Sequence, residues 1–248
     1  MRRWLKHAII GSRFEGAVKR AHSALTGSKS SLYDAQTIAI MRRVLRPDSI
    51  AIDIGAFEGS MLRHMIRFAP RGRHFAFEPV PEQFDRLKVS FPQARVYPYA
   101  LGAEPGTVTF HHVLGHPALS GLRRRLASLP DEEVREIQVP METIDRVIPA
   151  DTAIAFIKVD VEGGELGVFQ GGVRTLRRNR PVVVFECGLG GANHFGSAPS
   201  QIFDLLAGEA TLKVSRLGDW LIGQPSLSRQ SFSEEFEKGL NFYFVAHP

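Results

Sequence analysis

The amino-acid sequence predicts an α/β protein in which an open, mostly parallel sheet carries helices on both faces. Short apolar runs that end in glycine or an acidic residue alternate along the chain with segments of helical spacing. The runs are apolar almost throughout, which is typical of parallel strands that are buried on both faces. A chain of 248 residues fits one such domain with appendages.

Each element can be placed by its local pattern, in order along the chain. Strands are expected at residues 49–55, 73–79, 94–101, 153–160 and 181–187, and helices at 58–69, 81–91 and 165–177. The apolar residues of the first of these helices recur at helical spacing, and a proline opens the second. Two further strands, at 211–217 and 240–248, are separated by a long loop and indicate a closing hairpin.

Residues 1–47 are expected to form a helical extension to a main domain at 48–248. The stretch "GSKSS" at 27–31 predicts a linker between a basic first helix and a second helix at 33–45. Residues 106–149 break the alternation of strands and helices, with two strand-like stretches around a basic segment. We interpret this part as an insertion near the functional site.

Composition and charge restrict the class of protein. Apolar residues make up 44% of the chain and charged residues 23%, as in globular proteins. The single cysteine, Cys187, excludes an intrachain disulfide and fits a reducing compartment. The net charge is +5, but the basic residues are scattered and not interleaved with aromatic ones, so no nucleic-acid partner is predicted. No stretch resembles an export signal or a membrane span, and we expect a cytoplasmic protein without stable membrane insertion.

The loop after the first strand, "DIGAFEGS", indicates the kind of cofactor. A dinucleotide fingerprint is led by glycine so that a pyrophosphate can approach the backbone. Here the strand ends in Asp53, and Glu58 follows in the same loop, so two carboxylates would repel a pyrophosphate. An acid-led glycine loop suits the ammonium and sulfonium groups of S-adenosylmethionine. Glu78 ends the next strand, where a carboxylate can accept hydrogen bonds from ribose hydroxyls.

These residues resemble the FkbM-type methyltransferases, class I enzymes that use S-adenosylmethionine. The resemblance rests on "DIGAFEG", "FAFEPVPEQFDRL", "YALGAEPGTVTF", "IKVDVEGGELGVFQGG" and "PVVVFE", in this order. Gly164 stands where the family usually has alanine, and Phe57 where it often has asparagine. The resemblance implies a Rossmann-like sheet with a final antiparallel strand. It also implies O-methyl transfer to a hydroxyl of a sugar, a glycan or a polyketide-type natural product. Residues 1–47 and 111–137 lie outside the match and would define the acceptor.

The resemblance also implies which residues bind the cofactor. The first loop would line the methionine end, Glu78 the ribose, and Ala100 and Leu101 would lie near the adenine. The complete set of expected cofactor-binding residues is Asp53, Gly55, Ala56, Phe57, Glu58, Gly59, Glu78, Pro79, Ala100, Leu101 and Asp160. Asp160 is expected close to the sulfonium, because it ends the fourth strand beside the switch point.

The stretch "IKVDVEGGE" gathers three carboxylates where a buried strand should end. Methyl transfer to an alcohol is an in-line displacement that needs a base for the hydroxyl proton. Crowded carboxylates raise one another's pKa, and Lys158 is not expected to relieve this crowding. Glu165 is interpreted as a first-turn acid of the following helix. We predict Asp160 as the base or the hydroxyl-positioning group and Glu162 as second candidate. Further catalytic candidates are Glu186 and His194.

Three alternatives stay open at this point. Several converging carboxylates could hold Mg²⁺ through oxygen ligands, although no metal is expected. A nicotinamide-dependent oxidoreductase can be built on a similar sheet, but the glycine-led fingerprint is missing. A non-catalytic partner subunit could keep the cofactor fold without turnover, although the acids at the strand ends are intact.

Overall fold

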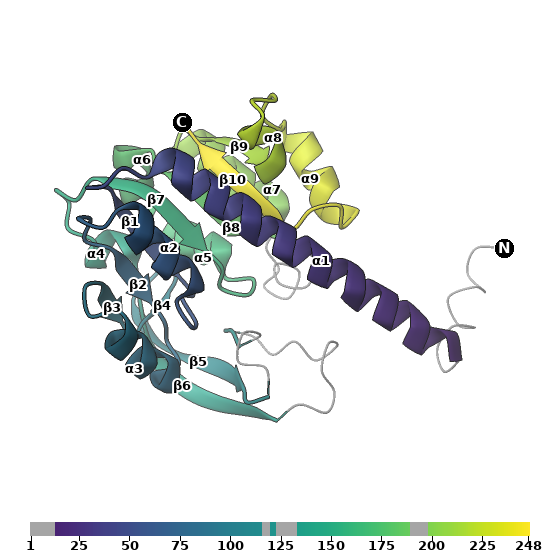
Figure 1. Cartoon of the computed structure of the whole chain (residues 1–248), viewed down its shortest axis with the longest axis horizontal. Coiled ribbons are helices and arrows are strands. Elements are labelled where there is room, and N and C mark those ends of the chain that lie inside the picture. Colours follow the sequence, from purple (N-terminus) through teal and green to yellow (C-terminus); the bar gives the residue numbers. More distant parts are fainter. Residues whose placement is uncertain (1–12, 116–119, 123–132, 189–197) are drawn as a thin grey trace.

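The computed structural model of the chain describes residues 13–115, 120–122, 133–188 and 198–248. In this part of the chain, a seven-stranded sheet lies between two layers of helices, and a smaller sheet of three strands lies at one end (Figure 1). The large sheet has the order β3-β2-β1-β7-β8-β10-β9. Its strands are β1 (Ile50–Ile54), β2 (Phe75–Phe77), β3 (Arg95–Tyr97), β7 (Ile154–Val159), β8 (Val182–Glu186), β9 (Lys213–Arg216) and β10 (Tyr243–His247).

The strand directions confirm the predicted fold class. β10 is antiparallel to both of its neighbours, whereas β3, β2, β1, β7 and β8 pair in parallel. The chain leaves β1 towards β2 and β3 on one side and later returns to build β7 and β8 on the other side. The resulting switch point lies between β1 and β7. In open α/β sheets, ligands bind beyond the carboxyl ends of the strands at such a point.

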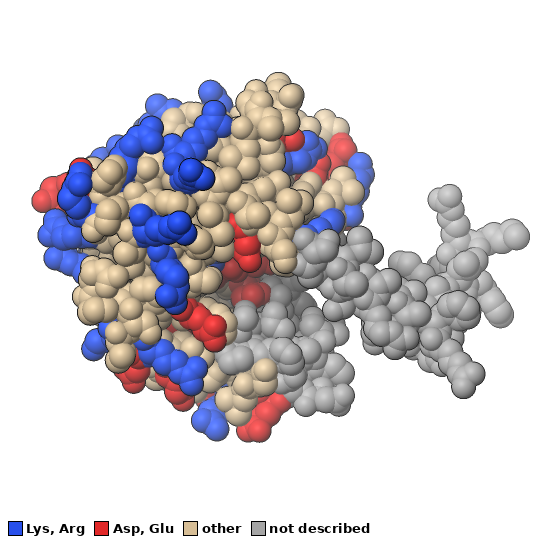
Figure 2. Space-filling view, in the orientation of Figure 1, with Lys and Arg blue, Asp and Glu red and all other residues tan. Residues whose placement is uncertain are grey.

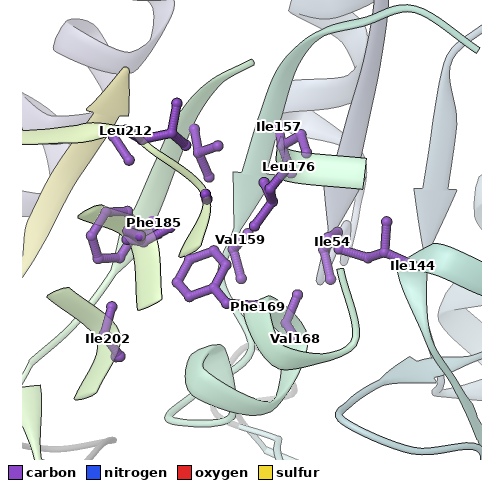
Figure 3. Packing of buried hydrophobic residues seen from close by; sticks show 14 of the residues in the cluster. Ile54, Ile144, Ile157, Val159, Val168, Phe169, Leu176, Phe185, Ile202 and Leu212 are labelled. Atoms are coloured by element: carbon purple, nitrogen blue, oxygen red, sulfur yellow. The ribbon is translucent and has the colours of Figure 1, made fainter. Parts of the chain in front are cut away.

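One face of the sheet packs against the later helices. Ile54, Val159 and Phe185 of the sheet pack with Val168 and Phe169 (Figure 3). The Phe169 and Phe185 rings meet edge to face at 5.4 Å, and burial of each such ring stabilises the fold by roughly 1.5–3 kcal/mol. The helices of this layer are α4 (Ile144–Val147), α5 (Glu165–Gln170), α6 (Val173–Asn179), α7 (Pro199–Asp204) with the π-helix η3 (Leu205–Glu209), and α9 (Arg229–Glu237).

The other face packs against α1 (Arg13–Val44), α2 (Ser60–Phe68), α3 (Pro81–Ser90) and α8 (Leu217–Leu221). Helix α1 crosses this face diagonally, and its first turns extend beyond the sheet (Figure 1). Ile40 and Met41 of α1 are completely buried. No helix in the described ranges is both long enough and apolar enough to cross a membrane.

The linker predicted at residues 27–31 is wrong, because α1 is one continuous helix of 32 residues. Glycine in a helix interior costs only about 1 kcal/mol relative to alanine. Tertiary contacts of the same helix outweigh this cost, since most helical stability in proteins comes from packing. Lys29 Nζ, for example, donates a hydrogen bond of 3.1 Å to the carbonyl oxygen of Leu240.

Two other predicted elements are each divided in the structure. Residues 94–101 form β3 and then β4 (Ala100–Leu101), which belongs to the small sheet; Pro98, between them, has no N–H for a strand ladder. The predicted helix at 165–177 is broken into α5 and α6 at two glycines. A Cβ atom at Gly171 would lie 2.0 Å from the carbonyl oxygen of Gly102, so the chain needs glycine there.

The interval 106–149 contains the antiparallel pair β5 (Gly106–Val113) and β6 (Val134–Glu142). The pair of strands expected in this interval is therefore confirmed. The small sheet has the order β4-β6-β5. Because β4 directly follows β3, this sheet extends from the same end of the molecule as the carboxyl ends of the parallel strands.

Candidate functional site

A row of polar side chains lies at the carboxyl edge of the sheet, on the face that α1 covers. It consists of Asp53 of β1, Lys158 of β7, Glu186 of β8 and Tyr243 of β10. Strand pairing aligns the row, because Asp53 lies opposite Lys158 and Glu186 lies opposite Tyr243. Side chains alternate along a strand. On the same face, the residues two positions further into the sheet are apolar and belong to the core. They are Ala51, Phe156, Val184 and Val245.

Asp160, the first residue after β7, accepts two hydrogen bonds from this row. Lys158 Nζ lies 3.0 Å from Asp160 Oδ2, and the Tyr243 hydroxyl donates to the same oxygen at 2.6 Å. The prediction that Lys158 would not relieve the acidic stretch is therefore wrong. Side-chain alternation continues past the end of β7, so that Lys158 and Asp160 point to the same side. Only 10% of the Lys158 side chain and 24% of the Asp160 side chain are exposed, so water screens the pair weakly.

The acidic groups at this edge have very different pKa values. Burial acts to raise the pKa of Asp160, but the Lys158 ammonium and the hydrogen bonds from Glu186, Tyr243 and Lys158 outweigh it and lower that pKa to about 2. Burial and the Asp160 charge raise the pKa of Glu186 well above its ordinary range. The two carboxyl groups therefore titrate as a pair, in which Glu186 keeps its proton to higher pH than Asp160 does. Crowding was expected to raise the pKa of Asp160, but in the structure it is the pKa of Glu186 that is raised.

Unusual backbone geometry brings two loops together: the loop after β1, which begins at Gly55 (the first loop), and the loop after β7, which carries Asp160 and Glu162 (the acidic loop). Gly55 has a φ of 75°, and a Cβ atom there would lie 1.9 Å from the carbonyl oxygen of Asp160. Glu162 adopts a left-handed φ of 58°, which costs on the order of 1 kcal/mol in a residue with a side chain. Glu165, at the start of α5 as predicted, holds this turn. Its Oε1 accepts hydrogen bonds from two backbone N–H groups of the turn, the shorter being 3.0 Å from Gly163.

A polar cavity of about 520 Å³ lies beneath α1, between the sheet edge and the start of α2. Its ionisable and hydroxyl groups come from Asp34, Asp53, Ser60, Lys158 and Asp160. Asp53 is only 1% exposed, yet neither of its carboxylate oxygens has a hydrogen-bond partner among the described residues. Burial raises the pKa of Asp53 to about 6, against the lowering effect of Lys158. A buried carboxylate without a partner is costly unless a cation or a donor reaches it.

A second cavity, of about 560 Å³, adjoins the first. Both cavities share the residues Gly55, Phe57 and Asp160. Glu78 lines the second one and is held by two backbone N–H groups, from Phe57 at 2.9 Å and from Val80 at 3.0 Å. Burial raises the pKa of Glu78 to about 7, although these hydrogen bonds lower it in part.

The walls of the second cavity are mainly apolar. The strand ends and the turn after β2 contribute Phe77, Pro79, Tyr99, Ala100 and Leu101. The inserted segment contributes Phe110, Ser120 and Leu122. Part of the interval 106–149 therefore lines this cavity.

Oxygen atoms of Asp160, Glu162 and Glu186 lie within 4.8 Å of one another. Such a set of carboxylates could bind a divalent cation through oxygen. Lys158 and Tyr243 already donate hydrogen bonds to Asp160, and the raised pKa of Glu186 opposes its ionisation beside Asp160. That the protein needs no metal stays a prediction.

The structure brings most of the predicted site residues to the two cavities. The predicted residues that line one cavity or both are Asp53, Gly55, Ala56, Phe57, Glu78, Pro79, Ala100, Leu101, Asp160 and Glu162. Glu58 is exposed and is not among the residues that line them. Gly59 caps α2 at a φ of 75° and packs against Phe91. His194 lies outside the described residues.

Several residues of the site were not predicted from the sequence, among them Lys158, Tyr243 and Asp34. Lys158 and Tyr243 could have been found by extending strand alternation to the sheet edge, because each lies two positions from a buried apolar residue of the same face. Asp34 gives no such signal. It is a lone acid on a helix, and only the packing of α1 over the sheet brings it to the polar cavity.

The sheet order and the two adjoining cavities at the switch point define an enzyme of the Rossmann-like α/β class. More specifically, residues 53–215 match the methyltransferase FkbM domain, and the chain belongs to this family. It is therefore a methyltransferase, and the oxidoreductase alternative is not supported.

Two relatives and one solved structure illustrate the similarity. The 2-O-methyltransferase NoeI of Sinorhizobium fredii is 25% identical over 199 residues, which cover 72% of this chain and 78% of NoeI. The hexuronic acid methyltransferase AglP of Haloferax volcanii is 26% identical over 200 residues, which cover 77% of each chain. The crystal structure of methyltransferase FkbM from Methylobacillus flagellatus superimposes with a TM-score of 0.50 and 15% identity. That match covers 85% of this chain and half of the other, and it supports the fold.

Proposed function

We propose that the protein transfers a methyl group from S-adenosylmethionine to a hydroxyl group of a sugar or glycan. The observation that carries this proposal is the pair of adjoining cavities that share Gly55, Phe57 and Asp160 at the switch point. One cavity is mainly apolar, and its acids are the buried Glu78 and the partly buried Asp160 and Glu162. The other is polar and contains the buried carboxylate of Asp53, which has no hydrogen-bond partner in the described part of the chain. The two chemistries match the two halves of this cofactor.

The adenosine half fits the apolar cavity. Adenine would lie against Ala100 and Leu101, and Glu78 would accept hydrogen bonds from the ribose hydroxyls, as acids at this strand end do in related folds. Two backbone N–H groups hold the Glu78 carboxylate without using all of its lone pairs. The cavity therefore combines an apolar surface for a base with acceptors for a sugar.

The methionine half fits the polar cavity. Its ammonium would meet Asp53, and its carboxylate would lie near Ser60, at the N-terminus of α2, where backbone N–H groups favour an anion. Asp160 belongs to both cavities and so lies where the sulfonium would join the two halves. Its low pKa keeps a negative charge beside that cationic sulfur.

In the reaction, an acceptor oxygen attacks the methyl carbon, the carbon–sulfur bond breaks, and its electron pair returns to sulfur. The hydroxyl proton passes to a carboxylate, giving a methyl ether and S-adenosylhomocysteine. A group with a pKa near 2 is a weak proton acceptor. Asp160 therefore positions the reactants, and its neighbour Glu162 is the better candidate for the base.

The relatives support a carbohydrate acceptor. One is named a 2-O-methyltransferase and the other a hexuronic acid methyltransferase. A polyketide-type acceptor receives no comparable support. The inserted segment that contributes Phe110, Ser120 and Leu122 would form the acceptor side of the cleft.

Calorimetric titration with S-adenosylhomocysteine tests the cofactor. Wild type should bind it and should not bind NAD⁺. Glu78→Gln should weaken the affinity about tenfold, because hydrogen bonds to a charged group are worth about 1.5–3 kcal/mol. Glu82→Gln, the same change on an exposed turn of α3, serves as the control. Wild type that binds no S-adenosylhomocysteine would overturn the proposal.

The acceptor is tested with cofactor carrying a labelled methyl group and two oligosaccharides, one neutral and one containing hexuronic acid. Mild alkali then distinguishes the products, because it hydrolyses a methyl ester and leaves a methyl ether intact. Label that resists alkali supports O-methylation of a hydroxyl. Label that is released would instead show methyl transfer to a carboxylate.

A further inference from the structure

We propose that Asp34 of α1 binds the ammonium group of the cofactor together with Asp53, so that the N-terminal helix forms one wall of the cofactor site. This inference rests on the proposed function. It extends the site beyond residues 53–215, the part of the chain that matches the family. Asp34 would then act as a cofactor-binding residue contributed by a segment outside that match.

Helix α1 is fixed over the sheet edge by contacts of the residue next to Asp34. Tyr33 is 5% exposed, and its hydroxyl donates a hydrogen bond of 2.8 Å to Asn241 Oδ1. Its ring meets Phe242 edge to face at 4.7 Å and lies 5.4 Å from the ring of Tyr243. Three successive residues before and within β10 therefore hold this turn of the helix.

Contacts near the C-terminal end of α1 also hold the helix against the rest of the domain. The Arg43 guanidinium donates a hydrogen bond of 2.9 Å to the carbonyl oxygen of Leu221 and lies over the Trp220 ring. Lys29 adds the hydrogen bond to Leu240 described above. Because the helix is held on both sides of Asp34, the fold fixes the backbone at this residue, whose exposed side chain lines the polar cavity.

Asp34 and Asp53 come to the polar cavity from opposite walls, one from α1 and one from β1. Asp53 is nearly completely buried and has no hydrogen-bond partner among the described residues. An ammonium group has three N–H donors, and one carboxylate cannot accept all of them in good geometry. Two carboxylates that line the same cavity can divide these donors between them. Lys158, the cation in this lining, is already bonded to Asp160.

The charge distribution of the surface agrees with a cationic ligand at this position. Figure 2 shows acidic side chains gathered near the centre of the face that α1 crosses, with mainly basic side chains above and to the left of them. Burial acts to raise the pKa of Asp34, and Lys158 acts to lower it. A local negative field within a basic surface attracts a ligand that is positively charged at both its sulfonium and its ammonium.

The test compares two ligands that differ only in the amino-acid part. S-adenosylhomocysteine carries the ammonium and carboxylate, and 5′-methylthioadenosine lacks both. By calorimetry, Asp34→Asn should weaken S-adenosylhomocysteine binding about tenfold and leave 5′-methylthioadenosine binding within about twofold. Asp34→Glu should restore part of the affinity. Asp85→Asn, on an exposed position of α3, is the matched control and should change neither ligand.

Each other outcome has a distinct meaning. If wild type binds S-adenosylhomocysteine and Asp34→Asn binds it equally well, the role of Asp34 is overturned while the proposed function stands. If Asp34→Asn weakens both ligands to the same degree, Asp34 acts through the structure of the cleft, and the inference is likewise overturned. Melting temperatures without ligand show whether the variant is folded. Wild type that binds neither ligand would instead refute the proposed function.

Discussion

The hydroxyl of Tyr243 donates a 2.6 Å hydrogen bond to Asp160 Oδ2 and so joins the antiparallel strand β10 to the acidic loop after β7. The two residues are 83 positions apart in the chain. Asp160 accepts this bond and the one from Lys158 on the same oxygen. The final strand therefore takes part in the site as well as completing the sheet.

Tyr243→Phe should lower kcat about tenfold while changing affinity for S-adenosylhomocysteine by less than about threefold. Loss of the hydroxyl removes a charge-assisted hydrogen bond, worth about 1.5–3 kcal/mol, that orients Asp160 and keeps its pKa low. Steady-state kinetics and calorimetry separate the two effects. Tyr97→Phe on β3, at the opposite edge of the sheet, is the control. Unchanged kcat in Tyr243→Phe would show that the orientation of Asp160 does not matter for turnover.

Lys158→Met should destabilise the fold by about 3 kcal/mol at pH 7, since removal of one partner leaves a charge buried without compensation. Lys158 is 8% exposed and faces both Asp160 and Asp53. The pKa of Asp160 is lowered in the folded state, so its contribution to stability is present above its unfolded pKa and is lost as the pH falls towards 2. Urea unfolding at pH 7 and pH 3.5 measures this. A variant as stable as wild type at pH 7 would contradict the ion pair's role.

The sequence was sufficient to predict the parallel strands and the acids that end them. Buried parallel strands are continuous apolar runs, and Asp53, Glu78 and Asp160 stand where those runs stop. Each of these signals is local, because it requires only the pattern of neighbouring residues. The fold class follows from the same alternation.

Contacts between distant segments could not be predicted in this way. Tyr243 reaches Asp160, and Asp34 reaches the polar cavity, only after the sheet and α1 have packed. The continuity of α1 through Gly27 has the same origin, since tertiary packing overrides a local preference for a break. The low pKa of Asp160 also depends on hydrogen-bond partners in β10 and β8.

Gly55→Ala should abolish detectable binding of S-adenosylhomocysteine and lower the melting temperature. The new Cβ atom would lie 1.9 Å from the carbonyl oxygen of Asp160, at a φ of 75° that alanine rarely adopts. Gly106→Ala is the matched control, because nothing lies within 4 Å of a Cβ atom at that position. Differential scanning fluorimetry with and without ligand compares the two variants. Equal behaviour of both would show that the first loop can move away from the acidic loop without cost.

Glu165→Gln should become more stable relative to wild type as the pH rises from 5 to 8. Glu165 is 1% exposed, and burial raises its pKa to about 7, against the lowering effect of the Gly163 N–H group. A carboxyl group whose pKa is raised by folding binds its proton more tightly in the folded state. Its stabilising effect is therefore complete below the unfolded pKa and is lost as the pH rises through 7.

Glutamine keeps an oxygen that can accept the hydrogen bonds from the turn, but it does not ionise. The unfolding free energy of Glu165→Gln, measured relative to wild type, should therefore increase by about 1–3 kcal/mol between pH 5 and pH 8. Urea unfolding at pH 5, 6.5 and 8 gives this difference directly. The other buried carboxyls titrate in both proteins, so their contributions cancel in the comparison. A difference that stays constant with pH would mean that Glu165 does not ionise in this range, and that the turn carrying Glu162 does not depend on its charge.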